Sequence, residues 1–504
     1  MMLQIIGDFM TSLAFNMMKT AAKDFASKEH GHFIGGEWCK SANNQSFEIF
    51  DPSCAKAFTK VSLASKTEVD AAVAAARNAF ENGEWPHMQS TQRAKILWRI
   101  ADLIEEHGDI LAELESLDNG KPLSVAKIAD VSLAAEHFRY YASLVGKVSG
   151  NIVNLNTNFH AYTKKEPVGV VAQIIPWNFP LLMAAWKLAP ALACGCTVIL
   201  KPAEQTPLSA TYLMNLLKKA GIPNGVVNLV NGDGSTGALL SAHSDVDKVA
   251  FTGSTEVGKL ILQAASGNLK KVSLELGGKS PNIIFDDCDI EKAIDGSLNA
   301  IFFNHGQCCC AGSRLFIHEK IYDRVLEGLK KAAQKITLGI GMDSNTAMGP
   351  LVSKEQFDRV NSYISMGIKE GANVVCGAKS RSEGYFVEPT ILSNTNNTMS
   401  VVKEEIFGPV LCAMPFSSEE EVINHANNSI YGLAAGVWTK DINKAHRVSH
   451  KLRTGTVWVN CYNIFDAALP FGGYKQSGWG REMGLEALNL YTETKSICID
   501  LGDK

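Results

Sequence analysis

Short apolar segments that alternate with helical segments after Lys164 constrain the fold of this chain most. The apolar segments span residues 168–175, 197–200, 226–230, 249–252 and 272–274. Parallel strands that are buried on both faces have this continuous apolar composition. Between them, Thr206-Pro207 predicts a helix start with Thr206 as N-cap, and Gly221-Ile222-Pro223 predicts a helix end. This alternation predicts a doubly wound α/β domain with its ligand at the carboxyl ends of the strands.

Length and charge narrow the possible functions. A chain of 504 residues is too long for one core, so we expect two or more domains. Its 48 basic and 52 acidic residues form no long run of one sign, which argues against nucleic-acid and membrane-surface partners. The twelve cysteines lack the spacing of a zinc site and favour a reduced, cytoplasmic enzyme. Because the charge is balanced, small molecules or further copies of the chain are the expected partners. No stretch has the pattern of a membrane span, so we expect a soluble protein.

The N-terminal part is predicted to carry no chemistry. Residues 1–18 are apolar and rich in methionine, but no basic residue precedes them and the first arginine is Arg77. This pattern fits neither a secretory signal nor a mitochondrial presequence, and we expect a frayed extension over residues 1–24. A capping box at Ser65 and a helical apolar pattern over 96–104 predict two scaffold helices that end before a turn at 118–122.

Cys308, Cys309 and Cys310 form the most reactive feature of the sequence. A cysteine attacks as its thiolate, and only a few per cent of an ordinary thiol is ionised at neutral pH. A catalytic cysteine therefore needs help from its surroundings. The alternative is a buried cysteine-rich segment without function, because free cysteine is often simply a core residue.

Several loops at predicted strand ends could bind a dinucleotide. Residues 232–237 match G-x-G-x-x-G, but the acidic residue expected about twenty positions later is not evident. Residues 253–258, where a strand gives way to a helix, are the better phosphate site, although an ordinary helix cap would look the same. Lys201 and Glu204 close another strand. Glu204 there would bind the ribose hydroxyls of NAD and repel the added phosphate of NADP, unless the two residues form only a surface ion pair.

Asn178 and Glu275 are candidates for the reaction itself. Asn178 lies in a loop after a predicted strand, where its amide could donate to a developing oxyanion or simply stabilise a turn. Glu275 follows an apolar run, and burial there would raise the pKa of its carboxyl toward that of a general base. A structural acid at the end of a strand is the alternative for Glu275.

Six motifs in a fixed order give a resemblance to a known family. They read Pro-Trp-Asn-Phe-Pro, Lys-Pro-Ala-Glu, Phe-Thr-Gly-Ser-Thr-Glu-x-Gly, Leu-Glu-Leu-Gly-Gly-Lys, Gly-Gln-x-Cys and Glu-Glu-x-Phe-Gly-Pro. From residue 33 to 494 the chain resembles the NAD(P)-dependent aldehyde dehydrogenases. The resemblance implies an α/β fold with a Rossmann-like NAD-binding domain, an α/β catalytic domain and a small β oligomerisation arm. The corresponding segments are 25–144 with 168–277, then 278–476, and lastly 145–167 with 477–504.

The same resemblance implies a role for individual residues. Cys309 would be the nucleophile, Glu275 the general base, Asn178 the oxyanion donor together with the Cys309 N–H, and Glu482 a proton relay behind Glu275. No metal is expected. The residues implied to contact NAD are Ile175, Trp177, Lys201, Glu204, Gly234, Gly253, Ser254, Gly258, Leu276, Glu405 and Phe407. Those implied to contact the aldehyde are Phe179, Met183, Trp186, Phe303, Phe465 and Phe471.

The implied reaction is NAD-dependent oxidation of an apolar aldehyde to its acid through a cysteine thiohemiacetal and thioester. An aromatic pocket without extra carboxylates favours an uncharged aldehyde over betaine aldehyde. Residues 465–471 are also similar to bacterial phenylacetaldehyde dehydrogenases, so phenylacetaldehyde is the predicted substrate. The alternatives are a broad aliphatic aldehyde dehydrogenase, a silent structural protein of the same fold and a thiol hydrolase without cofactor. A homo-oligomer is implied, with a tetramer favoured over a dimer.

Overall fold

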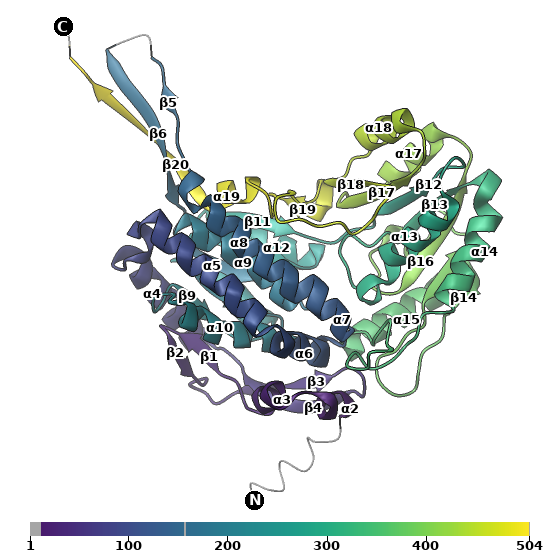
Figure 1. The fold of residues 1–504 in the computed structure, drawn as a ribbon, viewed down its shortest axis with the longest axis horizontal. Helices are drawn as coiled ribbons and strands as arrows, with labels where there is room; N and C mark the ends of the chain where they lie inside the picture. The colour runs from purple at the N-terminus through teal and green to yellow at the C-terminus, as the bar shows by residue number, and fades with distance from the viewer. Residues whose placement is uncertain (1–11, 156–157, 503–504) are drawn as a thin grey trace, which may run out of the picture.

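The computed structural model describes residues 12–155 and 158–502. Two large sheets, each flanked by helices, form the two lobes of the molecule, and a narrow three-stranded arm projects from one of them (Figure 1). A separate two-stranded ribbon, β3 (Ser46–Asp51) with β4 (Lys56–Ser62), lies near the N-terminus. Within the described ranges, no helix is both long and apolar enough to span a bilayer.

The first lobe contains an eight-stranded sheet with the order β19-β11-β10-β7-β8-β9-β1-β2. The central strands β11 to β9 are parallel, while the outer strands run antiparallel. The bounds are β1 His32–Ile34, β2 Glu37–Cys39, β7 Val170–Ile174, β8 Thr197–Lys201, β9 Val227–Leu229, β10 Lys248–Thr252, β11 Lys271–Glu275 and β19 Gly478–Trp479. The strands β7, β8 and β10 are buried along their whole length, which confirms the prediction of a two-sided parallel sheet.

Helices cover both faces of this sheet. Val170 and Ala172 belong to a core with α4, α11 and α12, whereas Val171 between them packs into the core of α5, α8, α9 and α10 on the opposite face. The bounds are α4 Lys66–Glu81, α5 Ser90–Glu106, α6 Gly108–Asn119, α7 Leu123–Val125, a π-helix Ala126–Ser132, α8 Leu133–Leu144, α9 Pro180–Cys194, α10 Leu208–Ala220, α11 Gly234–Ala242 and α12 Thr255–Ala265.

Two of the predicted helix boundaries are confirmed and one is wrong. Ser65 and Glu68 form the capping box of α4, and Gly221 ends α10 with a φ of +96°. Helix α10 begins one residue later than predicted, with Pro207 as its N-cap. Thr206 does not cap it, because its hydroxyl instead donates to the Trp177 carbonyl oxygen at 3.2 Å.

The second lobe contains a seven-stranded sheet with the order β14-β15-β16-β13-β12-β17-β18, parallel except for β14. Its strands are β12 Pro281–Ile284, β13 Arg314–His318, β14 Asn373–Cys376, β15 Thr390–Ser393, β16 Val410–Phe416, β17 Ala434–Trp438 and β18 Thr456–Val459. The helices are α13 Ile290–Phe302, α14 Tyr322–Ala333, α15 Lys354–Lys369, α16 Ser400–Lys403, α17 Glu419–Asn427 and α18 Ile442–Lys451.

The arm consists of β5 (Ile152–Val153), β6 (Phe159–Pro167) and β20 (Thr492–Asp500), and β6 pairs with β20 along its full length. The last strand of the arm, β20, follows α19 (Glu486–Leu490) near the C-terminus. The segment predicted for the arm, 477–504, also supplies β19, which joins the edge of the eight-stranded sheet instead.

The prediction of a frayed extension over residues 1–24 is wrong for the part that the structure describes. Residues 1–11 lie outside the described residues. Helices α2 (Leu13–Met17) and α3 (Thr20–Ala26) follow, and the Ser12 hydroxyl caps α2 by accepting from the Phe15 N–H at 3.1 Å. Phe15 packs with Ile49 and Phe58 in a local core. Burial of these apolar side chains stabilises the segment, which apolar composition alone could not distinguish from a loose tail.

Candidate active site

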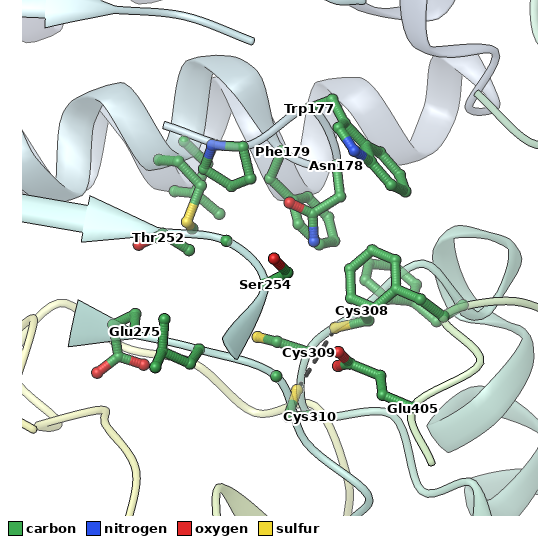
Figure 2. A pocket seen from close by; sticks show the side chains of 18 of the residues that line it. Trp177, Asn178, Phe179, Thr252, Ser254, Glu275, Cys308, Cys309, Cys310 and Glu405 are labelled. Atoms are coloured by element: carbon green, nitrogen blue, oxygen red, sulfur yellow. Dashed lines mark hydrogen bonds between the residues drawn. The ribbon is translucent and has the colours of Figure 1, made fainter. Parts of the chain in front are cut away.

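A cavity of about 780 Å³ lies at the carboxyl ends of the parallel strands of the first lobe. Its lining includes Asn178 from the loop after β7, Glu275 at the end of β11 and all three adjacent cysteines. In Figure 2 the Asn178 amide points toward Cys309, while Glu275 and Glu405 lie on opposite sides of the cysteines. The loop of Asn178, the end of β11 and the cysteine segment, which sequence reasoning selected separately, therefore meet in one cavity.

The three thiols form a compact cluster of which Cys309 is the least buried member. Cys308 and Cys310 are buried, and their sulfur atoms lie 3.4 Å apart. Hydrogen bonds from Cys309 and Cys310 lower the pKa of Cys308, and the bond to Cys308 in turn raises the pKa of the other two. The cluster can hold one thiolate with two thiols donating to it. All three thiols line the cavity, and that of Cys309 is the most accessible to a substrate.

The segment leading into the cysteines has an unusual backbone. Asn304, His305 and Gly306 have φ angles of +47°, +59° and +70°, and left-handed non-glycine residues are costly enough that they concentrate at functional sites. The side chain of Asn304 stabilises this bend, since its Nδ2 donates to the carbonyl oxygens of Asn178 at 3.0 Å and of Gln307 at 3.2 Å. Asn304, which sequence reasoning missed, thus joins the cysteine loop to the loop of Asn178.

The Asn178 side chain is held by one hydrogen bond and keeps a second amide hydrogen for a ligand. Its Nδ2 donates to the Gln307 carbonyl oxygen at 3.0 Å, and an amide nitrogen carries a second hydrogen. The side chain is only 4 % exposed. A buried amide fixed in this way can donate to an oxyanion next to Cys309 without first being reoriented.

Glu275 is a buried carboxylate without a partner. It is 4 % exposed, and among the described residues neither of its carboxylate oxygens has a hydrogen-bond partner. Burial, reinforced by the nearby charge of Glu482, raises the pKa of Glu275 well above its ordinary value. A carboxyl group with a raised pKa beside a nucleophile has the properties of a general base.

Behind Glu275 lies a buried ion pair that sequence reasoning found only in part. Glu482 accepts from Lys187 Nζ, and both side chains are almost fully buried. Lys187 lies in α9 and was missed, because its partner is 295 residues away in the sequence. The second oxygen of Glu482 has no partner among the described residues.

Loss of the lysine from this pair should destabilise the protein strongly. We expect Lys187→Met to lower the free energy of unfolding by about 3–5 kcal/mol, because it leaves the buried Glu482 charge uncompensated. The double variant Lys187→Met/Glu482→Leu should recover most of that loss, since neither charge then remains. Chemical denaturation followed by fluorescence measures both variants. Equal losses in the two variants would contradict a paired charge and point to lost packing instead.

The other end of the cavity is lined by the candidate dinucleotide residues. Trp177, Leu276, Glu405, Phe407 and the segment 252–257 at the start of α12 all line it. The ring of Trp177 meets that of Phe407 edge to face, with centroids 5.2 Å apart. Burial raises the pKa of Glu405 to about 7, although its carboxylate accepts from the Gly278 N–H at 2.8 Å.

Helix α15 supplies three cavity residues that sequence reasoning missed, Glu355, Gln356 and Arg359. Phe407 has a φ of +61°, and Gln356 holds this turn by donating to the Phe407 carbonyl oxygen at 2.6 Å. Arg359 donates to the Glu405 carbonyl oxygen at 2.6 Å. No motif marks Gln356 or Arg359, because the hydrogen bonds that they donate to this loop go to main-chain oxygen atoms.

Five of the predicted cofactor residues lie outside the cavity lining. They are Ile175, Lys201, Glu204, Gly234 and Gly258. Lys201 and Glu204 form an ion pair at 3.6 Å after β8, next to the Ile175 N–H, which donates to the Lys201 carbonyl oxygen. At the G-x-G-x-x-G match, the carboxylate of Asp233 already caps α11 by accepting from the Ser235 N–H at 2.9 Å. That cap weakens this loop as a phosphate site.

The residues that the resemblance implies for aldehyde binding all line the cavity, in a part that we call the aldehyde region. Phe179 stacks on Phe303 with centroids 6.0 Å apart, and Trp186 contacts the rings of both Phe465 and Phe471. Met183 lies one turn before Trp186 on α9. Further wall residues that sequence reasoning missed are Ser124, Val125, Ile128, Ala129, Leu133, Leu182, Asn299 and Asn463.

Comparison with known proteins agrees with this geometry. The aldehyde dehydrogenase family matches residues 38–497. An aldehyde dehydrogenase of Davidiella tassiana is 52% identical over 94% of this chain and 96% of its own. The structure of the Bacillus cereus aldehyde dehydrogenase with NAD+ covers 96% of this chain and 99% of its own, with 52% identity and a TM-score of 0.95. The Staphylococcus aureus betaine aldehyde dehydrogenase with NAD+ covers 96% and 97%, with 43% identity and a TM-score of 0.94.

The chain belongs to the aldehyde dehydrogenase family. It is an NAD-dependent aldehyde dehydrogenase, and the predictions of family, fold, enzyme class and cofactor are confirmed.

Proposed function

We propose that the enzyme oxidises an apolar aldehyde, with phenylacetaldehyde as the best candidate, to the carboxylic acid through Cys309. One observation carries this proposal: a half-buried thiol, a carboxylate without a hydrogen-bond partner among the described residues and an amide donor share a cavity with a cluster of aromatic rings. The thiol can add to a carbonyl, the amide can stabilise the oxyanion, and the rings can bind an apolar tail.

In the first step the Cys309 thiolate attacks the aldehyde carbon and forms a thiohemiacetal. Cys310 assists by donating a hydrogen bond that lowers the pKa of Cys309, whereas the bond with Cys308 raises it. The oxyanion then accepts hydrogen bonds from Asn178 Nδ2 and from the Cys309 main-chain N–H. Because Asn178 is already fixed by Gln307, little reorganisation is needed as the charge develops.

The cavity residues fit a dinucleotide beside this thiol. The Thr252 hydroxyl is buried without a partner among the described residues, and the start of α12 opens into the same cavity. A Cβ at Gly277 would lie 2.2 Å from a carboxylate oxygen of Glu405, so a larger residue there would push this carboxylate aside. Glu405, Phe407 and Trp177 would hold the nicotinamide end, and Lys201 with Glu204 the adenosine end. NAD, when bound, supplies the acceptor for the hydride that leaves the aldehyde carbon.

Glu275 completes the reaction by hydrolysing the thioester left on Cys309. Its carboxylate takes a proton from water, which attacks the thioester carbonyl, and the thiolate leaves with the carboxylic acid as product. Glu482, paired with Lys187, would pass the proton on from Glu275. With this base present, hydrolysis is favoured over transfer of the acyl group to a second thiol compound.

The aldehyde region favours an uncharged substrate. Its wall combines aromatic and aliphatic side chains with Ser124, Asn299 and Asn463, and it holds no carboxylate among the described residues. A quaternary ammonium group binds best to aromatic cages or carboxylates. The rings here are packed on each other, which suits a flat apolar group better. Betaine aldehyde, named for the Staphylococcus aureus relative, is therefore a weaker candidate.

Substrate preference is the direct test of this proposal. We expect kcat/KM, measured as NADH formation, to be at least about tenfold higher for phenylacetaldehyde than for acetaldehyde, because burial of a ring contributes well over 1.4 kcal/mol. Hexanal should fall between them and betaine aldehyde below all three. A preference for hexanal would support the broad aliphatic alternative, and no turnover of any aldehyde would support the silent structural protein.

A homo-oligomer remains part of the proposal. The arm exposes Ile152, Val153, Phe159 and Ile499, and a cluster of exposed apolar side chains is typical of a protein contact. We propose a tetramer rather than a dimer, and a cytoplasmic location. The NAD-binding domain would comprise 25–144 with 168–277 and the catalytic domain 278–476.

A further inference from the structure

We propose that the buried Lys121–Asp130 ion pair is a specificity-determining element that sets the shape of the aldehyde region for a bulky substrate. The inference rests on the proposed function, because it concerns the fit of the same aldehyde. Neither residue lines the cavity, so both would act as positioning residues.

The pair connects two wall elements. Lys121 Nζ lies 2.7 Å from Asp130 Oδ2, and both side chains are completely buried. Asp130 lies in the π-helix 126–132, and its neighbours Ile128 and Ala129 line the cavity. π-helical turns are rare and occur mainly at functional sites. The ion pair therefore holds an irregular turn that forms part of the wall.

The Lys121 ammonium group also lies against Phe179, which belongs to the aromatic wall of the aldehyde region. Lys121 Nζ lies 4.5 Å from the centre of the Phe179 ring, and Phe179 stacks on Phe303. A cation against the face of a ring attracts it, and this attraction is stronger away from water. Movement of Lys121 would therefore shift both the π-helix and the Phe179 ring.

A third contact links the pair to α9. Lys121 Nζ lies 3.4 Å from Glu115 Oε2, while Glu115 Oε1 accepts from the Leu181 N–H at 2.7 Å in the first turn of α9. This helix carries Met183 and Trp186 of the aldehyde region. One buried ammonium thus contacts the supports of three wall segments. A small aldehyde bound at Cys309 would not need these walls, but an aryl-alkyl aldehyde would.

Asp130→Asn tests this inference, because the amide has the shape of the carboxylate and lacks its charge. We expect the kcat/KM ratio of phenylacetaldehyde to acetaldehyde to fall roughly tenfold, mainly through a higher KM for phenylacetaldehyde. The kcat for acetaldehyde should stay within about twofold of the unmodified enzyme. An unchanged ratio, or an equal loss with both aldehydes, would overturn the inference.

Asp118→Asn is the matched control. Asp118, which lies in α6, is a buried carboxylate like Asp130. Its Oδ2 accepts from the Leu208 N–H at 3.1 Å, and neither Asp118 nor Leu208 lines the cavity. The control should leave the substrate ratio unchanged, and a similar fall in both variants would overturn a specific role for Asp130.

If Asp130→Asn does not fold, Lys121→Met/Asp130→Asn removes both charges and takes its place. Failure of both to fold while Asp118→Asn folds would overturn the inference and assign the pair to stability alone. Absence of turnover in the unmodified enzyme would instead contradict the proposed function, and the inference would fall with it.

Discussion

Cys309→Ala should abolish aldehyde oxidation while NAD still binds. We expect kcat to fall by roughly 10⁴-fold or more, because removal of a covalent nucleophile closes the pathway through the thioester. The dinucleotide residues lie at the other end of the cavity and do not use the thiol. NADH formation measures the first effect, and titration with NAD measures the second.

Cys308→Ala and Cys310→Ala are the matched controls, since each removes a neighbouring thiol that is buried. Both should keep most of the activity, because neither of these thiols supplies the sulfur atom that attacks the aldehyde. If Cys308→Ala were inactive and Cys309→Ala active, the nucleophile would be Cys308, whose pKa is the one lowered by its neighbours.

Glu275→Gln should slow the second half of the reaction selectively. Loss of a general base typically costs about 10²–10⁴-fold, and it should act here on thioester hydrolysis. The first turnover of NADH should therefore remain as a burst equal to the enzyme concentration, followed by a slow steady rate. Stopped-flow absorbance records both phases. Loss of the burst itself would contradict this assignment and place Glu275 in the first step.

The raised pKa of Glu275 also fixes two pH dependences. Hydrolysis needs the deprotonated carboxylate, so its rate should rise with pH through the raised pKa, and this dependence should be absent in Glu275→Gln. The pKa of Glu275 is higher in the folded protein than in the unfolded chain. The free energy of unfolding therefore falls as pH rises from the unfolded pKa toward the folded pKa. Glu275→Gln should consequently melt at a higher temperature than the unmodified enzyme at neutral pH, and the difference should vanish in acid.

Sequence reasoning predicted the parallel sheet, because the segments that form β7, β8 and β10 are mostly apolar on both faces. It also selected Asn178, Glu275 and Cys309, each of which lies in a loop or at a strand end with a chemically active side chain. The structure then showed that these residues share one cavity.

Other features could not be predicted because they depend on contacts distant in sequence. Lys187 looks like a polar interruption of an apolar helix until its contact with Glu482 is known. Gln356 and Arg359 donate to main-chain oxygen atoms of the loop, and the left-handed turn at Asn304 is held by a hydrogen bond to the distant Asn178 carbonyl oxygen. The first helices were mistaken for a loose extension, because their packing on Ile49 and Phe58 depends on the ribbon that follows.

The most direct test of the account is to identify the atom that carries the acyl group. Glu275→Gln, mixed with NAD and phenylacetaldehyde, quenched in acid and digested, should yield a peptide whose Cys309 carries a phenylacetyl thioester in the mass spectrum. Omission of NAD should remove this mass. An acyl group on Cys308 or Cys310, or no acyl peptide despite NADH formation, would contradict the proposed mechanism.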